Sequence, residues 1–270
     1  VVADSMNWSA DVPALTTSLR GAVEVDVEVR TLERAAHSGM GAAAPDALTA
    51  LAHVLASLHD ADGEVAVAGL VSGTRPGPDL DATRWRAETG VLEGVSLLGR
   101  GALTDRLWMH PSVAVLAIDA PRLQDSANVL VPAARARVSM RIAPGQDPAT
   151  AQAALRDHLV AAAPWGAHVQ VVDGLTGRPV SLGVSSRAAE VAQRCLRDAF
   201  GHEAVQIGVG GSIPFIAVLA ETYPDAAILV TGAGDPEASW HGTNENLHLG
   251  MFARTCVFEA LLLHRLAQQG

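Results

Sequence analysis

Residues 21–33 alternate apolar and charged side chains with a period of two. Successive side chains of a β-strand point to opposite faces, so this stretch predicts a strand with one buried and one solvated face. The buried face would consist of Val23, Val25, Val27 and Val29. Half-solvated strands are typical of antiparallel sheets, because parallel sheets are usually covered on both faces. We therefore expect an antiparallel sheet in this part of the chain.

The region from residue 21 to about 181 continues with a mixture of helical and strand patterns. We expect helices at 45–60, within 79–92 and at 148–164, and further strands at 113–120, 134–144 and 167–174. Apart from the helix within 79–92, residues 61–105, which include a Gly- and Pro-rich stretch, allow no prediction of a helix or strand. This order predicts an α+β module in which helices cover one face of an antiparallel sheet.

The remaining residues follow an α/β alternation. Helices are expected at 185–201, 210–224 and 246–268, and strands at 204–209 and 226–234. The run 226–234 is almost wholly apolar, which is typical of buried parallel strands, and we expect residues 1–3 to join the same sheet. Residues 1–20 and 182–270 would thus form a mostly parallel α/β domain, with helices on both faces, into which the module 21–181 is inserted.

Composition excludes several classes of protein. The net charge is −10 and no cluster of basic residues occurs, which argues against nucleic-acid or anionic-membrane binding. Cys195 and Cys256 are the only cysteines, so a disulfide scaffold is excluded and a reducing compartment, the cytoplasm, is expected. The sequence opens on a buried-strand pattern without a signal peptide, and we expect a preceding segment, in which any localisation signal would lie.

Two polar loops follow predicted parallel strands. Asp4 follows residues 1–3, and His241 follows the run 226–234. Open α/β sheets place their sites at the carboxyl ends of strands, and Asp and His are good ligands for zinc. The alternative is that Asp4 caps a turn and His241 is a surface imidazole. Two ligands are also fewer than the three usual in a catalytic zinc site.

Three further features could contribute to binding. The glycine run 208–214 opens a helix, where its N–H groups could hold an anion or serve only as a turn. His37 lies in a loop, where a lone histidine is usually solvated. Arg141 lies between apolar residues of a strand, where an unpaired guanidinium is costly, so it needs a carboxylate from the protein or from a ligand.

In this order, the fragments resemble the M20 metallopeptidase family of carnosinase-like dipeptidases, carboxypeptidases and amino-acid deacylases. The matching pieces extend over the whole chain and are VVADSMNW, SLRG, HSGM, NVLVPAARARVSMRIAPGQDP, GGSIP and WHGTNE. GGSIP and the length of the insertion favour the dipeptidase branch. The resemblance implies that 1–20 and 182–270 are the C-terminal part of a catalytic domain, and that 21–181 is its lid and dimerisation domain.

The resemblance also implies a role for each candidate residue. Asp4 and His241 would each bind one of two Zn²⁺ ions, with Mn²⁺ or Co²⁺ as alternatives. Arg141 would grip the C-terminal carboxylate of a dipeptide or short peptide.

Other implied contacts involve the substrate and a second subunit. Asn128 would contact the substrate, and the substrate backbone would be held by Gly210, Gly211 and Ser212. His37 would reach into the neighbouring subunit and stabilise the oxyanion, which makes a homodimer through the lid sheet part of the mechanism.

The sequence departs from the family pattern in one important respect. Neither the His-x-Asp motif nor the Glu-Glu pair of the family occurs in the 270 residues. These motifs supply the general base and the other metal ligands, so we expect the isolated chain to hold one metal ion or none and to be inactive. An N-acyl-amino-acid deacylase and a non-catalytic dimerisation or ligand-binding module remain the alternatives.

Overall fold

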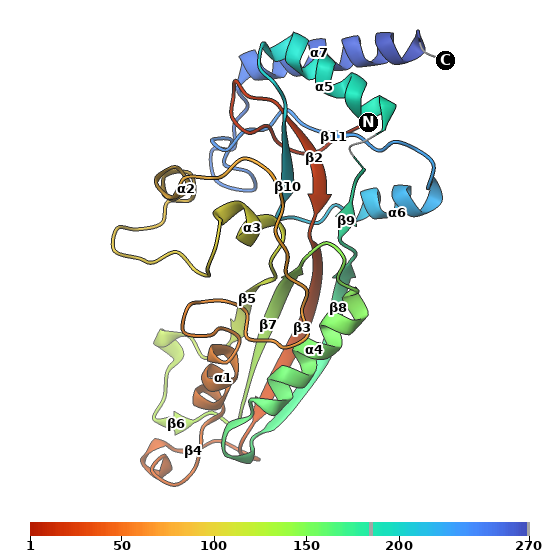
Figure 1. Ribbon diagram of the computed structural model, residues 1–270. Coiled ribbons are helices and arrows are strands. Elements are labelled where there is room, and N and C mark those ends of the chain that lie inside the picture. The colour runs from red at the N-terminus through yellow and green to blue at the C-terminus, as the bar shows by residue number, and fades with distance from the viewer. Residues whose placement is uncertain (184–185, 269–270) are drawn as a thin grey trace.

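The computed structural model describes residues 1–183 and 186–268, which form a five-stranded and a four-stranded sheet joined end to end, and a small two-stranded sheet (Figure 1). The α-helices are α1 (Ala47–Ala56), α2 (Ala82–Thr89), α3 (Leu103–Trp108), α4 (Pro148–Ala161), α5 (Arg187–Phe200), α6 (Pro214–Thr222) and α7 (Leu249–Ala267). The strands are β1 (Val2–Ala3), β2 (Ala14–Leu19), β3 (Gly21–Arg30), β4 (Ala36–His37), β5 (Ser112–Asp119), β6 (Val129–Leu130), β7 (Ala133–Ile142), β8 (His168–Gly177), β9 (Val180–Ser181), β10 (Val205–Val209) and β11 (Val230–Thr231).

The first sheet is the antiparallel sheet expected from the alternating sequence. Its strand order is β5-β7-β3-β8, and every neighbouring pair is antiparallel. Helices α1 and α4 lie across one face (Figure 1), where the four valines of β3 are fully buried. The other face is solvated and carries cross-strand ion pairs, among them Arg137 with Asp26. The predicted α+β architecture is therefore confirmed.

The second sheet has the strand order β1-β11-β2-β10, with β9 paired to β2. β1 runs parallel to β11 and β10 parallel to β2, whereas β2 is antiparallel to both β11 and β9. Helices α5 and α7 pack on one face, and Trp108 of α3 packs on the other, against Ala14 and Ile207. Residues 1–3 join this sheet as expected.

Several segments differ from the sequence-based expectation, among them α3, where no helix was predicted. The apolar run 226–234 forms a strand only at Val230–Thr231, because β1, its parallel partner, is itself only two residues long. Strand β2 was not predicted, because all six of its residues are buried and no alternation marks it. Its polar side chains are satisfied internally, as in the 2.6 Å hydrogen bond between Thr16 Oγ1 and Ser5 Oγ.

Two very short connections between strands link the five-stranded and the four-stranded sheet. Arg20 alone separates β2 from β3, and residues 178–179 separate β8 from β9 on the return. In Figure 1 the ribbon of β2 continues directly into β3. Across the described ranges, none of the helices is both long and apolar enough to span a bilayer.

Candidate functional site

The segments that follow β1 and β11 run side by side. Beyond the strands, Met6 forms a parallel bridge with Gly234, and the Asn7 N–H donates to the Gly234 carbonyl oxygen at 2.8 Å. The Asn7 side chain donates to the carbonyl oxygen of Gly232 at 2.9 Å. The loops that carry Asp4 and His241 therefore leave the same edge of the sheet.

The turn that presents His241 is built on Gly234. A Cβ atom at this glycine would overlap the indole ring of Trp240, so the ring rests directly on the strand end. His241 has a left-handed φ of 58°, and its N–H donates to Glu245 Oε2 at 3.3 Å. Glu245 thus ties down the loop. The side chains of Asp4 and His241 are both exposed.

These donors do not complete a metal site by themselves. In the part of the chain that the structure describes, no group of three or more His, Cys, Asp or Glu side chains could hold a metal ion. A carboxylate and an imidazole are suitable zinc donors, but a catalytic zinc usually has three protein ligands. Asp4 and His241 therefore match the chemistry of a zinc site and fall short of its ligand number.

Arg141 lies where the two sheets meet. It is half-buried on β7, opposite Ala22 of β3 and Ser112 of β5. Within residues 1–183 and 186–268, no carboxylate forms an ion pair with it. The sequence predicted a carboxylate partner for this guanidinium, and none of the described residues supplies it.

A second arginine adjoins Arg141. Arg20 is only 7% exposed and donates to the carbonyl oxygens of Gly210 at 3.2 Å and His110 at 3.1 Å, and to Ser112 Oγ at 3.0 Å. Burial, with the positive charge of Arg141 as the second cause, lowers the pKa of Arg20 to about 10. No carboxylate among the described residues neutralises it either.

The glycine loop after β10 completes this cluster. A Cβ atom at Gly210 would lie 2.9 Å from Arg20 Nη2, so a larger residue would press on the guanidinium. The hydroxyl of Ser212 is buried and has no hydrogen-bond partner among the described residues. It faces Gly177, which pairs with Ala22, the cross-strand neighbour of Arg141. The structure thus brings Arg20 and Arg141 to the loop 210–212.

His37 and Asn128 lie together, but in a different place. His37 pairs with Val129 across β4 and β6, and the Ser38 N–H donates to the Asn128 carbonyl oxygen at 2.9 Å. Both side chains are exposed. β4 and β6 lie at the end of the four-stranded sheet remote from the five-stranded sheet (Figure 1). The ten-residue β3 separates the two ends by roughly 30 Å, at about 3.4 Å per residue. Within one chain, His37 therefore does not join Arg141.

Sequence reasoning missed Arg20 as a site residue. SLRG is one of the fragments on which the family resemblance depends, but the resemblance assigns no role to Arg20 within it. The preceding residues ALTTSL are half polar, so no pattern in the sequence marks the arginine that follows them as buried.

Comparisons with known proteins agree on one family. Residues 17–167 match the family model described as the peptidase dimerisation domain. The chain is 33% identical over 267 residues to a cysteinylglycine-S-conjugate dipeptidase of Corynebacterium striatum, covering 97% of this chain and 59% of that protein.

Solved structures of the same fold resemble it along almost its whole length. The dipeptidase Dug1p of Saccharomyces cerevisiae has a TM-score of 0.82 at 19% identity, covering 97% of this chain and 57% of that chain. Human carnosine dipeptidase 1 has a TM-score of 0.81 at 22% identity, covering 98% and 58%. The chain thus spans under two thirds of the length of each of these relatives.

Proposed function

This chain belongs to the M20 peptidase family, and we propose that it forms the lid and the carboxylate-binding part of a zinc-dependent dipeptidase. The substrates would be dipeptides or short peptides with a free C-terminal carboxylate. The dipeptidase relative at 33% identity supports this substrate class. Because the chain spans 59% of that relative, the activity of the whole protein is part of the proposal.

The observation that carries the proposal is the pair of arginines without acidic partners. In a chain with a net charge of −10, Arg20 and Arg141 adjoin each other, and no described carboxylate pairs with either. A carboxylate ligand would relieve their mutual repulsion and could accept a bidentate hydrogen bond from Arg141. The buried hydroxyl of Ser212 would gain an acceptor at the same time.

The zinc dependence rests on the two exposed donors. Asp4 and His241 would contribute one ligand each to a pair of metal ions, whose other ligands and general base would come from polypeptide outside these 270 residues. A bound pair of ions would polarise the scissile carbonyl and activate water. The part contributed by this chain is to hold the substrate carboxylate, with Gly210, Gly211 and Ser212 beside the substrate backbone.

The proposed homodimer would form through the edge of the lid sheet. β5 is an outer strand, and Val115, Leu116 and Ile118 are 41%, 56% and 51% exposed. An exposed apolar edge strand is a ready surface for pairing with another chain. Because His37 and Asn128 lie far from Arg141 of their own chain, they would serve the active site of the partner subunit.

A non-catalytic role is the second candidate for the 270 residues on their own. It is favoured by the absence, within the described ranges, of any three-residue metal-ligand group. In that case the chain would bind carboxylate ligands and dimerise without turnover. The acyl-amino-acid deacylase alternative shares the same carboxylate site. The expected compartment is the cytoplasm, in keeping with the free thiols of Cys195 and Cys256.

The test uses the gene product that contains this chain. Arg141→Ala should raise KM for dipeptides with a free carboxylate by about tenfold or more, since a hydrogen bond to a charged group contributes roughly 1.5–3 kcal/mol. The same dipeptides with an amidated C-terminus are the control and should be affected much less. An equal loss on both would contradict the carboxylate role, and a parallel panel of acetylated amino acids would separate dipeptidase from deacylase.

A further inference from the structure

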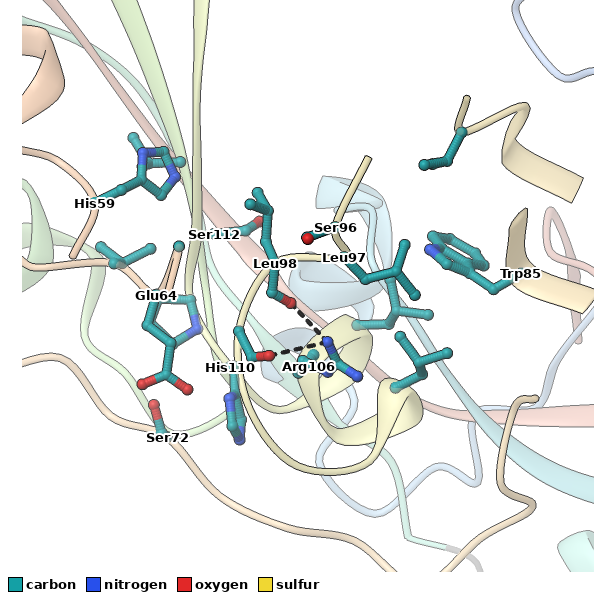
Figure 2. Close-up of a pocket in the computed structure, with 18 of the residues that line it drawn as sticks. His59, Glu64, Ser72, Trp85, Ser96, Leu97, Leu98, Arg106, His110 and Ser112 are labelled. Carbon is teal, nitrogen blue, oxygen red and sulfur yellow. Dashed lines mark hydrogen bonds between the residues drawn. The ribbon is translucent and has the colours of Figure 1, made fainter. Parts of the chain in front are cut away.

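A pocket of about 660 Å³ lies beside the arginine cluster (Figure 2). It is enclosed by the loop 91–99, by α3, by residues 59–65 and by the start of β5. This volume is typical of small-molecule sites, which range from roughly 300 to 1,000 Å³. The proposed peptide-bond chemistry does not by itself require a pocket here.

The lining is chiefly apolar. Its apolar members include Trp85, Val91, Val95, Leu97, Leu98, Leu103 and Leu107. Val95 and Leu98 are 50% and 65% exposed although they line the pocket, so the loop 91–99 offers uncovered apolar surface to whatever enters. Burial of such surface by an apolar group would stabilise a complex.

Arg106 holds the wall of this pocket in place. Its Nη1 donates to the carbonyl oxygens of Leu98 at 2.6 Å and Gly99 at 3.1 Å (Figure 2). Its Nε is buried and has no partner among the described residues. The negative charge of Glu64 in the same lining is neutralised by Arg100, at 3.2 Å. The interior is therefore apolar with a cationic bias.

Two lining residues connect the pocket to the carboxylate site. Ser112 lines the pocket and lies directly opposite Arg141 in the β5–β7 ladder. Arg20 also lines the pocket and donates both to Ser112 Oγ and to the Gly210 carbonyl oxygen. A carboxylate held by these arginines would therefore sit at the rim of the pocket.

We propose that the pocket receives the side chain of the carboxyl-terminal residue of the substrate, so that the protein selects substrates with a large apolar residue at that position. This inference rests on the proposed function for the placement of the carboxylate. The Cα atom that bears the carboxylate also bears the side chain and the amide nitrogen. The amide nitrogen belongs to the bond to be cleaved and would face the proposed metal ions, so the side chain is the group left to enter the adjoining pocket. The apolar lining then determines which side chains are favoured.

The test measures binding without turnover. Calorimetry in the presence of a chelator would compare N-acetyl-L-phenylalanine with N-acetylglycine on the gene product that contains this chain. We expect the phenylalanine ligand to bind at least about tenfold more tightly, which is the scale of discrimination in apolar pockets. Val95→Trp and Ser96→Trp, which fill the pocket, should reduce that ratio to about one. Leu92→Trp is the matched control, because Leu92 belongs to the same loop, is 74% exposed and does not line the pocket.

Three outcomes would overturn the inference: equal affinities in the unchanged protein, a ratio unaffected by both filling variants, or no binding of either ligand. The proposed function fails separately. If dipeptides are not hydrolysed while the phenylalanine preference and its loss in Val95→Trp persist, the pocket inference stands and the dipeptidase proposal does not. If dipeptides are hydrolysed at the same rate whatever their C-terminal side chain, the dipeptidase proposal stands and the pocket inference fails.

Discussion

Arg20 donates a hydrogen bond from Nε to the carbonyl oxygen of Gly210 at 3.2 Å, so the residue that joins the two sheets is bonded to the loop before α6. The same guanidinium reaches His110 and Ser112 at the start of β5. One side chain therefore bonds to two separate segments, the loop at Gly210 and the start of β5, beside the proposed carboxylate site. The charge at this junction is buried without an acidic partner among the described residues, which is costly unless a ligand supplies one.

Ser212→Ala should separate stability from binding. The Ser212 hydroxyl is buried without a described partner, so its removal should leave the free energy of unfolding unchanged or raise it by up to about 1 kcal/mol. Affinity for N-acetylglycine, measured by calorimetry, should fall by roughly three- to tenfold, the equivalent of one neutral hydrogen bond.

The control for this change is Ser18→Ala. Ser18 Oγ accepts a 2.9 Å hydrogen bond from Arg75 Nη1 and is 4% exposed, so its removal should lower stability by about 1–3 kcal/mol. A similar loss of stability in Ser212→Ala would mean that its hydroxyl is bonded within the protein and is not awaiting a ligand.

Gly232→Ala should weaken the edge of the five-stranded sheet that carries Asp4 and His241. A Cβ atom at this position would overlap the carbonyl group of Ser5, so the backbones would have to separate. We expect a loss of about 1–3 kcal/mol or more in urea unfolding, as for other overpacked sites. Gly183→Ala, where the added atom meets nothing within 4 Å, should be close to neutral. Equal stabilities of the two variants would show that the strands part easily.

Ile118→Lys should dissociate the proposed dimer. Ile118 is 51% exposed on the outer strand β5, and a lysine there would oppose pairing between two edges. Light scattering coupled to size exclusion would give the mass of the particle. Leu175→Lys, on the opposite edge strand β8 and 78% exposed, should leave the dimer intact. If only Leu175→Lys dissociated the dimer, the interface would lie at β8, and the proposal that it lies at β5 would be contradicted.

Asp26→Asn should remove part of the acid sensitivity of the lid sheet. The hydrogen bond from Arg137 lowers the pKa of Asp26 below its ordinary 3.8. A carboxyl group with a lowered folded-state pKa stabilises the protein above the unfolded-state value, and that stability is lost as the pH falls through the folded-state value. The pair is exposed, so Asp26→Asn should cost less than about 1 kcal/mol at neutral pH.

The pH dependence supplies the check on that assignment. The difference between Asp26→Asn and the unchanged protein should shrink to zero as urea unfolding is repeated at pH values progressively below 3.8. Glu93→Gln, at an exposed position of the loop 91–99, serves as the charge-matched control. A constant difference at every pH would assign the effect to packing.

The sequence predicted those strands and helices in which the spacing of apolar residues matches the face that is buried. The valines of β3 alternate with mostly charged residues because helices cover one face of the sheet and solvent contacts the other. β2 could not be found in this way, since Thr16 and Ser18 are buried and depend on Ser5 and Arg75 for their hydrogen bonds. Contacts between distant segments leave no periodic trace in the sequence.

The residues of the candidate site also divide into those that the sequence could indicate and those that it could not. The need of Arg141 for a carboxylate partner, from the protein or from a ligand, followed from its apolar strand neighbours. The role of Arg20 could not, because its acceptors on Gly210 and His110 lie 190 and 90 residues away along the chain. The roles of Asp4, His241, His37 and Asn128 stay predictions.

The brevity of the two connections between the sheets has a mechanical consequence. One residue, Arg20, links β2 to β3, and two residues, 178 and 179, link β8 to β9. A change in the angle between the sheets would bend these few dihedral angles, which lie beside Arg141 and Ser212, and also the segment between α3, which packs on the five-stranded sheet, and β5. A rotation of the four-stranded sheet about this junction would therefore move the proposed carboxylate site little, while the far end, with His37, would travel the greatest distance.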